Sequence, residues 1–213
     1  MNIVQRTLVL MNSYLKSYGP SNIKKLLWDK EFSGSKWNFI DNTAGDCIYP
    51  HLEKHAANGS ILDLGCGPGN TANELDITAY RSYIGVDISE AALAKAAKRS
   101  EGNGRADKNL FVQSDFLKYQ PTHQFDVIVF RESIYHVPLG QIRVILDKYS
   151  KYLSDRGVFI VRLDVLDGKK GQIKKRPKAM MEVIETEFDI LEKQRYPGEF
   201  GPTVMVFRPC RPR

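Results

Sequence analysis

The sequence has few cysteines and no long apolar run, and both absences exclude whole classes of protein. Its three cysteines, Cys47, Cys66 and Cys210, lie far apart, which argues against a disulfide framework and indicates free thiols in a reducing compartment. No Cys/His cluster has the spacing of metal ligands, so we expect no metal site. No apolar stretch is long enough to cross a bilayer, and residues 3–15 lack the basic start and the cleavage site of a signal peptide. We therefore predict a cytoplasmic protein with no membrane partner.

Positive charge is unevenly distributed along the chain. The 213 residues carry a formal net charge of +6, and the stretch at 168–178, here called the basic segment, holds six basic residues and no acid. We interpret the basic segment as a solvated loop followed by the start of a helix, because no aromatic residue lies among the bases to stack on nucleobases. The alternative is a docking surface for an anionic substrate or a nucleic acid.

Short apolar runs alternate with amphipathic stretches from residue 61 onward. The apolar runs predict five strands, at residues 61–64, 83–86, 110–112, 125–130 and 158–161. Two helices are predicted, at 90–99 after the N-cap Ser89 and at 141–153, and a turn at 155–157 precedes the fifth strand. This alternation is typical of a doubly wound α/β fold with parallel strands.

Both ends of the chain depart from this alternation. The runs at 188–196 and 203–207 are too close together for a crossover helix, so they predict an antiparallel hairpin at the sheet edge. Earlier in the chain, residues 3–18 and 44–57 have a helical pattern, and 28–39 form an aromatic-rich linker. A chain of this length fits one domain with a sizeable core.

The first strand leads directly into a loop with glycine at every second position. Gly65, Gly67 and Gly69 permit positive φ and let a ligand approach the backbone closely. A dinucleotide-binding loop needs G-x-G-x-x-G, but Asn70 stands after the third glycine, and no Gly-Lys-Ser/Thr follows to make a P-loop. An acid, Asp63, precedes the loop and would repel a pyrophosphate. The loop therefore favours a ligand without phosphates.

S-Adenosylmethionine (SAM) has no phosphate but carries a carboxylate, an ammonium and a sulfonium group. Asp63 is placed to meet the ammonium, directly or through water, and Asp87, at the end of the second strand, to accept from both ribose hydroxyls. After the third strand, Asp115 can accept from the adenine amine and Phe116 can cover the ring. Taken singly, each acid also fits a structural role: Asp63 as a helix-dipole partner, Asp87 as a helix cap and Asp115 as a turn residue.

The order of these features resembles the class I SAM-dependent methyltransferase family over residues 44–208. The loop matches the first family motif, and the segments at 84–89, 125–129 and 153–158 resemble three others. The resemblance implies a doubly wound α/β fold, with a seven-stranded, mostly parallel sheet and an antiparallel C-terminal hairpin. It also implies SAM as cofactor and S-adenosylhomocysteine as product, with these cofactor-binding residues: Asp63, Gly65, Cys66, Gly67, Asn70, Asp87, Ile88, Asp115, Phe116, Arg131 and Trp37.

The resemblance further implies that residues 1–43 form a helical lid over a methyltransferase domain at 44–213. The aromatic residues of this lid would enclose the substrate and keep water out, or alternatively belong to the core; they are Trp28, Phe32, Trp37 and Phe39. Cys66, inside the glycine loop, is expected to be a small filler and not a nucleophile, because no base lies near it in sequence.

The segment after the fourth strand, residues 131–138, is expected to face the transferring methyl group, because ligands bind beyond the carboxyl ends of the strands. His136 is a candidate general base, Glu132 a candidate anchor for a cationic amine, and Tyr135 a candidate to orient a hydroxyl. Two alternatives stay open: His136 hydrogen-bonded to backbone under the helix that follows, and Arg131 as the structural partner of Glu132.

The same segment bears on the methyl acceptor. It does not resemble the Asp/Asn-Pro-Pro-Tyr/Phe tetrad of DNA and RNA amine methylases, and Glu-Ser-Ile-Tyr-His resembles bacterial small-molecule enzymes. We therefore predict methyl transfer to a nitrogen or oxygen atom of a small molecule, with nucleic acid not expected as a partner. The alternatives are a nucleic-acid or protein methyltransferase that docks through the basic segment, and a non-catalytic SAM-binding module.

Overall fold

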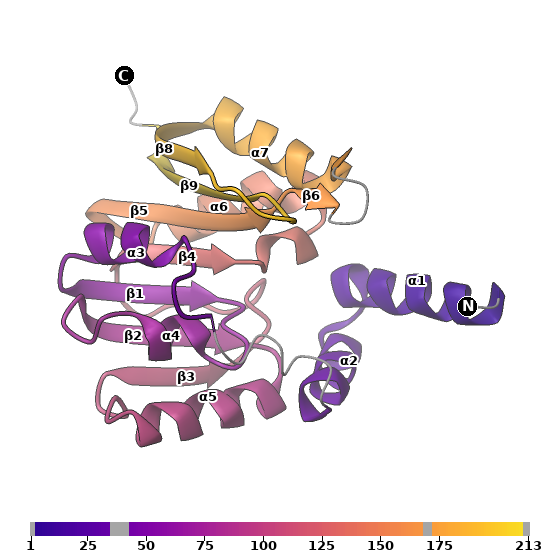
Figure 1. Ribbon diagram of the computed structural model, residues 1–213, viewed down its shortest axis with the longest axis horizontal. Coiled ribbons are helices and arrows are strands. Elements are labelled where there is room, and N and C mark those ends of the chain that lie inside the picture. Colours follow the sequence, from indigo (N-terminus) through magenta and orange to yellow (C-terminus); the bar gives the residue numbers. More distant parts are fainter. Residues whose placement is uncertain (1–2, 35–42, 168–171, 211–213) are drawn as a thin grey trace.

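A seven-stranded sheet forms the centre of the protein in the computed structural model, which describes residues 3–34, 43–167 and 172–210 (Figure 1). The strand order is β3-β2-β1-β4-β5-β9-β8, with β9 antiparallel to both of its neighbours and the other pairs parallel. The predicted fold and its C-terminal hairpin are confirmed. The strands are β1 (Gly59–Leu64), β2 (Tyr80–Asp87), β3 (Asn109–Gln113), β4 (Phe125–Arg131), β5 (Leu153–Asp164), β8 (Phe188–Arg195) and β9 (Pro202–Pro209).

Helices cover both faces of the sheet, because successive side chains of its central strands are buried on opposite sides. Ile61 of β1 packs in the same apolar layer as Leu52 of α3, whereas Leu62 packs with Leu146 of α6 and Ile184 of α7. The helices of the domain are α3 (Tyr49–Ala56), α4 (Asn70–Glu74), α5 (Glu90–Gly102), α6 (Ile142–Ser150) and α7 (Lys175–Glu187), with 3-10 turns at Ile134–His136 and Leu139–Gln141. Two short strands, β6 (Leu166–Asp167) and β7 (Gln172–Ile173), form a separate hairpin.

The N-terminal helices α1 (Ile3–Tyr18) and α2 (Ser21–Ser33) lie beyond the carboxyl ends of the parallel strands, and α1 projects away from the sheet (Figure 1). The prediction of a helix over 3–18 is confirmed. The linker predicted to start at Trp28 is wrong, because Trp28 and Phe32 belong to α2. The good helix formers Lys24 to Leu27 directly precede Trp28, and Lys30 and Glu31 follow it, so helix propensity is a stronger signal here than aromatic content. Trp37 and Phe39 lie outside the described residues.

Three other predicted boundaries shift. The helix expected over 44–57 begins only at Tyr49, and the one expected over 141–153 ends at Ser150. The predicted turn at 155–157 lies inside β5, at the point where the register against β4 shifts. A Cβ at Gly157 would lie 2.8 Å from the Phe125 carbonyl oxygen, so the glycine allows this irregular pairing.

The described part of the basic segment contains β7, where a loop was expected, and then the start of α7, as interpreted; residues 168–171 lie outside the described ranges. Among the described residues, no helix has both the length and the apolar composition needed to cross a membrane.

Candidate active site

A cavity of about 850 Å³ opens at the carboxyl ends of the parallel strands, under α1 and α2. This volume lies within the range of about 300–1,000 Å³ typical of small-ligand sites. The loop after β1, the ends of β2 and β4 and the turn after β3 supply one wall, and side chains of α1 and α2 supply another. The position is the one expected for a ligand site in an open α/β sheet.

The glycine loop has the backbone conformation that its sequence predicts. Gly65, Gly67 and Gly69 have φ of +85°, +53° and +75°. A Cβ at Gly65 would lie 2.5 Å from Cβ of Ser133, so glycine is required there for space as well as for conformation. Cys66 is buried in the loop, and burial raises the pKa of its thiol well above the usual value, which fits the predicted role of an inert filler.

Asp87 joins the end of β2 to the glycine loop. Its two carboxylate oxygens accept from the backbone N–H groups of Gly67 and Ser89, each at 2.8 Å. The side chain that caps α5 is Ser89, whose Oγ accepts from Ala92 N–H at 3.2 Å, so Asp87 does not serve as the helix cap. Each oxygen of Asp87 keeps a further lone pair, and the residue lines the cavity. Burial raises the pKa of Asp87 to about 6.

Asp63 is not among the residues that line the cavity, although it directly precedes the loop. It is buried in β1, where one carboxylate oxygen accepts from the Tyr83 hydroxyl at 2.7 Å and the other has no hydrogen-bond partner among the residues that the structure describes. Burial raises the pKa of Asp63 to about 6. This geometry therefore does not place Asp63 in direct contact with a ligand in the cavity. A contact between Asp63 and the ligand through water is the alternative that the sequence analysis left open.

The raised pKa of Asp63 gives a prediction about stability. The folded state holds this proton more tightly than the unfolded chain, so the contribution of Asp63 to stability falls as pH rises from about 4 to about 6. Asp63→Asn does not titrate, and its unfolding free energy should improve relative to wild type over this range by an amount on the order of 2 kcal/mol. Denaturant unfolding of both proteins at several pH values checks this. A difference that stays constant with pH would contradict it.

The residues after β3 meet α2 as well as the cavity. Asp115 and Phe116 both line the cavity. One oxygen of Asp115 accepts from Ser21 Oγ at 3.0 Å and lies 3.5 Å from Lys24 Nζ, and the other accepts from Leu117 N–H at 3.0 Å. Asp115 thus closes a turn, as one interpretation of the sequence expected, and also ties α2 to the rest of the domain, a contact that the sequence motifs do not reveal.

Two further residues from the predicted cofactor site, Ile88 and Asn70, also line the cavity. Asn70 is the first residue of α4, and its side-chain oxygen accepts from Arg99 at 2.5 Å. Its amide is therefore oriented by α5, so we expect Asn70 to fix the end of the glycine loop.

The proposed pairing of Arg131 with Glu132 is wrong. Arg131 donates to Asp46 at 2.7 Å, and Glu132 instead accepts from Arg162 of β5 at 2.6 Å. Arg162 also donates to Asp164 at 2.9 Å. All five side chains line the cavity, and the sequence analysis missed Asp46, Arg162 and Asp164. A signal existed for the last two, which are polar residues at the carboxyl end of a buried strand.

Glu132 is unusual in both conformation and charge. Its φ of +54° lies in the left-handed region, which a residue with a Cβ adopts only when its surroundings hold it there. Burial raises the pKa of Glu132 to about 7, against the opposing charge of Arg162. Burial and the neighbouring Glu132 carboxylate raise the pKa of Tyr135 far above its ordinary value, so its phenol stays protonated.

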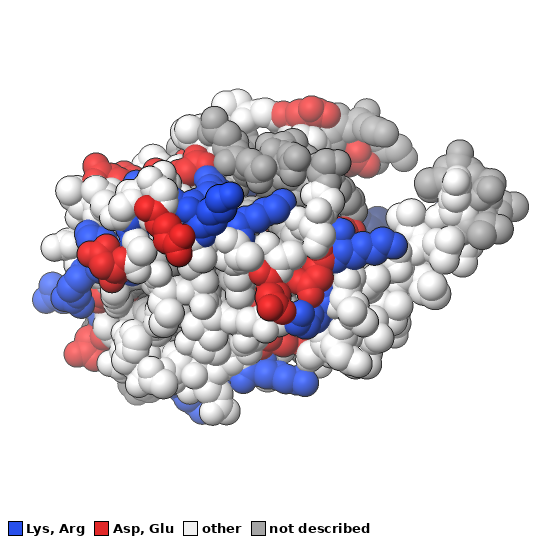
Figure 2. Space-filling view, turned by 90° about the horizontal axis from the view of Figure 1, so that it is seen from below, with Lys and Arg blue, Asp and Glu red and all other residues white. Residues whose placement is uncertain are grey.

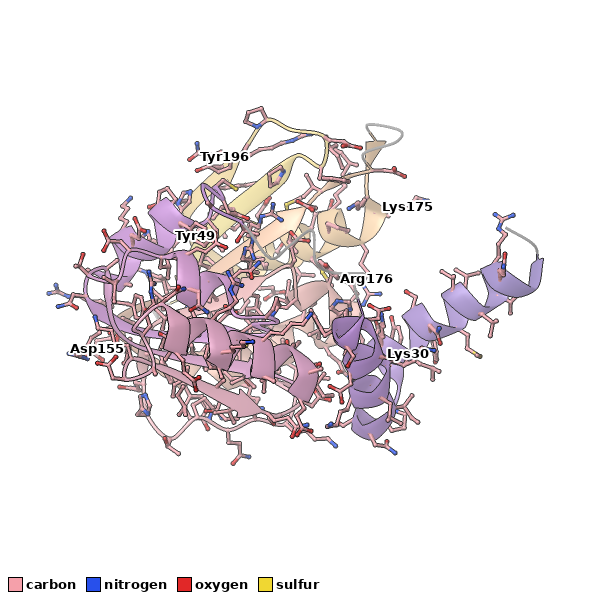
Figure 3. The ribbon with its side chains drawn as sticks, turned by 60° about the horizontal axis from the view of Figure 1, so that its bottom comes forward. Lys30, Tyr49, Asp155, Lys175, Arg176 and Tyr196 are labelled. Atoms are coloured by element: carbon pink, nitrogen blue, oxygen red, sulfur yellow. The ribbon has the colours of Figure 1, made fainter. Side chains whose placement is uncertain are left out.

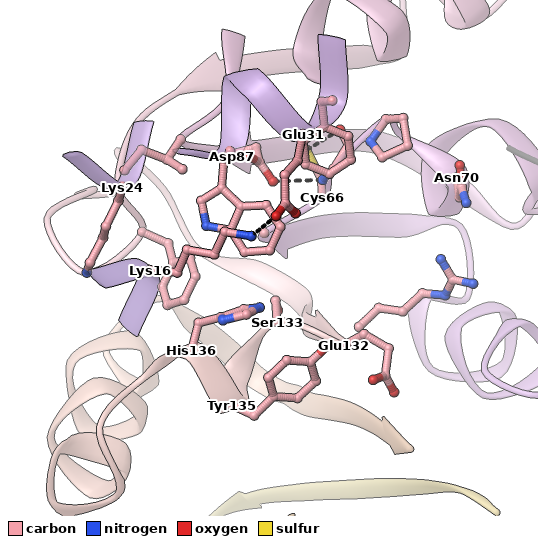
Figure 4. A pocket seen from close by; sticks show the side chains of 18 of the residues that line it. Lys16, Lys24, Glu31, Cys66, Asn70, Asp87, Glu132, Ser133, Tyr135 and His136 are labelled. Carbon is pink, nitrogen blue, oxygen red and sulfur yellow. Dashed lines mark hydrogen bonds and ion pairs between the residues drawn. The ribbon is translucent and has the colours of Figure 1, made fainter. Parts of the chain in front are cut away.

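His136 is neutral at physiological pH. Burial, together with the charges of Lys16 and Arg176, lowers its pKa to about 4. The edge of its ring meets Trp28 at a centroid distance of 5.0 Å. Figure 4 shows Asp87 on one side of the cavity and Glu132, Tyr135 and His136 on the other.

Contacts from α2 hold the N-terminal helices beside the cavity. Trp28 stacks on Phe32 at a centroid distance of 5.9 Å, and the Phe32 ring would contact a Cβ at Gly67 at 3.7 Å. Asp29 accepts from Ser89 Oγ at 2.8 Å and from Ala91 N–H at 3.2 Å, at the start of α5. Trp28 and Phe32 both line the cavity, which favours the role of an enclosure over that of core aromatics.

Comparison with known proteins gives one family match and several partial relatives. Residues 55–200 match the family described as a methyltransferase domain. A sterol 24-C-methyltransferase of Gibberella zeae is 31% identical over 100 residues, which cover 46% of this chain and 26% of that protein. Thiocyanate methyltransferase 1 of Brassica oleracea is 37% identical over 70 residues, or 33% of this chain and 30% of the relative. The matched part of the chain thus spans less than a third of either relative.

Solved structures share the fold at low identity. The N-methyltransferase NodS of Bradyrhizobium japonicum, in complex with S-adenosylhomocysteine, superposes with a TM-score of 0.69 at 18% identity, covering 88% of this chain and 98% of that one. The glycopeptide N-methyltransferase MtfA, in complex with SAM, gives 0.60 at 14% identity and covers 71% and 87%. At such identities the likeness establishes the fold alone.

Proposed function

Because this chain belongs to the methyltransferase domain family, we propose that it transfers the methyl group of SAM to a nitrogen atom of a small-molecule acceptor. The main support for SAM as the methyl donor is Asp87, a buried carboxylate in the cavity. It holds the glycine loop and keeps lone pairs that can accept from the two ribose hydroxyls of SAM. The charge of the cavity also supports SAM as the donor. The described lining holds six carboxylates and four basic side chains, which suits a cationic ligand better than a pyrophosphate.

The residues of the donor side have distinct roles in this proposal. Asp87 accepts from the ribose hydroxyls, Phe116 covers the adenine, and the backbone of the glycine loop binds the amino-acid part of SAM. Asp63 reaches the ammonium through water, because it lies behind the wall of the cavity. When bound, SAM supplies an electrophilic methyl group, and the chain positions the acceptor in line with it.

On the acceptor side, Glu132 is the stronger candidate to hold or accept a proton. Its pKa of about 7 matches a proton transfer near neutral pH, whereas the pKa of about 4 makes His136 a weak base there. Tyr135 orients the acceptor, and Trp28 and Phe32 of the lid exclude water. The carboxylates Glu132 and Asp164 favour an amine over an alcohol as acceptor, and the printed names of NodS and MtfA, both N-methyltransferases, agree with nitrogen.

A screen of acceptor pools with SAM carrying a labelled methyl group tests this proposal. We expect label in small primary or secondary amines. Label that appears only in RNA or protein would contradict the small-molecule acceptor, and RNA remains the main rival because an mRNA cap methyltransferase of Schizosaccharomyces pombe is 30% identical over 132 residues. Loss of binding with rising salt would identify that rival.

Glu132→Gln should lower kcat/KM for the amine by about 100-fold or more, because the variant can neither accept a proton nor attract a cation. In wild type, KM for the amine should rise as pH falls below about 7, since Glu132 becomes protonated there. The variant should lack this dependence. Steady-state kinetics across pH measure both effects.

The matched control is Glu101→Gln, which changes an exposed carboxylate near the end of α5 and should leave activity unchanged. SAM affinity should stay the same in both variants. If Glu132→Gln keeps the wild-type rate and pH profile, the acceptor role of Glu132 is wrong, although methyl transfer by proximity alone would survive.

A further inference from the structure

A helix that packs on its own domain normally turns its apolar face inward and its polar face outward, and α1 does the reverse. The face of α1 that lines the cavity is mostly polar, with Asn12, Ser13 and Lys16, and also holds Val9. These positions repeat every three or four residues, so they lie on one side of the helix. Apolar side chains on the opposite side face outward, and their exposed fractions are 48% for Leu8, 70% for Leu10, 49% for Met11, 61% for Tyr14 and 49% for Tyr18.

This outward face, defined by Leu8, Leu10, Met11, Tyr14 and Tyr18, forms a continuous apolar surface. Tyr14 and Tyr18 stack with ring centroids 4.8 Å apart. In the view of Figure 2, the described part of the projecting arm that holds α1 shows mostly uncharged side chains on the face turned to the reader. Contiguous exposed apolar surface of this kind marks an interaction site and not ordinary solvent-facing surface.

Positive charge adjoins the outward face. Residues 3–18 contain no acid, and the described end of the basic segment brings Lys175, Arg176 and Lys178 to the start of α7. The Arg176 guanidinium lies 5.9 Å from the Tyr18 ring centroid and donates to the Val137 carbonyl at 3.0 Å, so it joins α7 to α1, while Lys175 and Lys178 of the same turn are exposed. Figure 3 shows Lys175 and Arg176 at the end of α7 that lies toward the N-terminal helices. Ile173, just before α7, is 50% exposed.

We propose that the outward face of α1 and the basic start of α7 dock the protein on an anionic lipid surface. An interfacial helix buries its apolar face among lipid chains, tyrosines sit well at the headgroup level, and lysine and arginine attract anionic headgroups. A helix of this kind lies on the membrane surface and needs no apolar run long enough to cross the bilayer. The sequence analysis expected no membrane partner only because it found no such run, so that expectation does not exclude surface docking.

Charge favours lipid over a second copy of the chain. A two-fold contact through the outward face would bring together identical surfaces that lack acids on α1 and carry the same basic cluster. An anionic bilayer instead complements this charge. Because the polar face of α1 lines the cavity, docking would also place the cavity mouth close to the lipid surface, where an amphiphilic molecule is concentrated.

Vesicle co-sedimentation of the full chain tests the proposal. Binding should be strong to phosphatidylcholine vesicles that contain phosphatidylglycerol, weak to phosphatidylcholine alone, and reduced by added salt. The double variant Leu10→Gln, Met11→Gln should lower the partition coefficient by about tenfold or more through lost apolar burial. Lys175→Gln should lower it by about fivefold.

Matched controls separate docking from general effects. Val144→Gln changes an apolar residue on α6 that is 66% exposed, and Lys151→Gln removes an exposed charge just after α6. Neither should alter vesicle binding, and circular dichroism should show all four proteins folded. Equal binding to neutral and anionic vesicles, no binding to either, or equal losses in variants and controls would overturn the proposal. A dimer in light scattering that the double variant abolishes, without vesicle binding, would assign the face to a second copy.

Discussion

Gly65→Ala should destabilise the protein and remove its affinity for SAM. A Cβ at this position would lie 2.5 Å from Cβ of Ser133, whose side chain is held in place by the hydrogen bond from its Oγ to the Leu64 carbonyl at 2.5 Å. The backbone φ of +85° adds a penalty of about 1–2 kcal/mol for any residue with a Cβ. With overpacking of about 1–3 kcal/mol, the unfolding free energy should fall by about 2–5 kcal/mol.

Gly104→Ala is the matched control, because its φ of +65° carries the same conformational penalty while nothing lies within 4 Å of its Cβ position. The unfolding free energy of this variant should fall by only about 1–2 kcal/mol, and its SAM affinity should stay unchanged. Denaturant unfolding and ligand titration measure both variants. Equal destabilisation of the two would show that close packing against Ser133 is not what Gly65 provides.

Asp87→Ala should weaken SAM binding by about 1–3 kcal/mol, or roughly 5- to 150-fold in Kd, through the lost charged hydrogen bonds. The substitution also frees the N–H groups of Gly67 and Ser89, so part of the loss comes from a less ordered loop. Isothermal titration calorimetry measures the affinity. An unchanged Kd would remove Asp87 from the donor site.

Asp126→Ala provides the control for loop and strand effects. Asp126 is also a carboxylate that accepts from backbone N–H, that of Ser60 at 2.8 Å, but it lies at the amino end of β4, at the opposite end of the strands from the cavity. This variant should lose stability and keep its SAM affinity. If both aspartate variants lose affinity equally, the effect of Asp87→Ala reflects general destabilisation.

Much of the fold could be predicted because its determinants are local in sequence. A strand buried on both faces needs a continuous apolar run, as residues 127–130 provide, and a loop with three positive φ values needs its glycines at the right spacing. Ser89 could be recognised as an N-cap for the same reason, since the hydrogen bond it makes reaches only to Ala92.

The pairing of the charges around Arg131 and Arg162 could not be predicted, because these contacts depend on sheet register and not on proximity in sequence. Arg131 and Arg162 are paired across β4 and β5, so the two arginines share the acids around them. Glu132, adjacent to Arg131 in sequence, therefore meets Arg162, 30 residues away. Similarly, the amphipathic pattern of α1 predicted a helix but not that its apolar face would point outward.

Equilibrium dialysis of the full chain with labelled SAM tests the central claim most directly, with labelled NAD as the comparison ligand. The glycine loop, Asp87 and the excess of carboxylates in the cavity predict saturable binding of SAM at one site per chain and no binding of NAD at the same concentrations. Binding of NAD without binding of SAM would contradict the account.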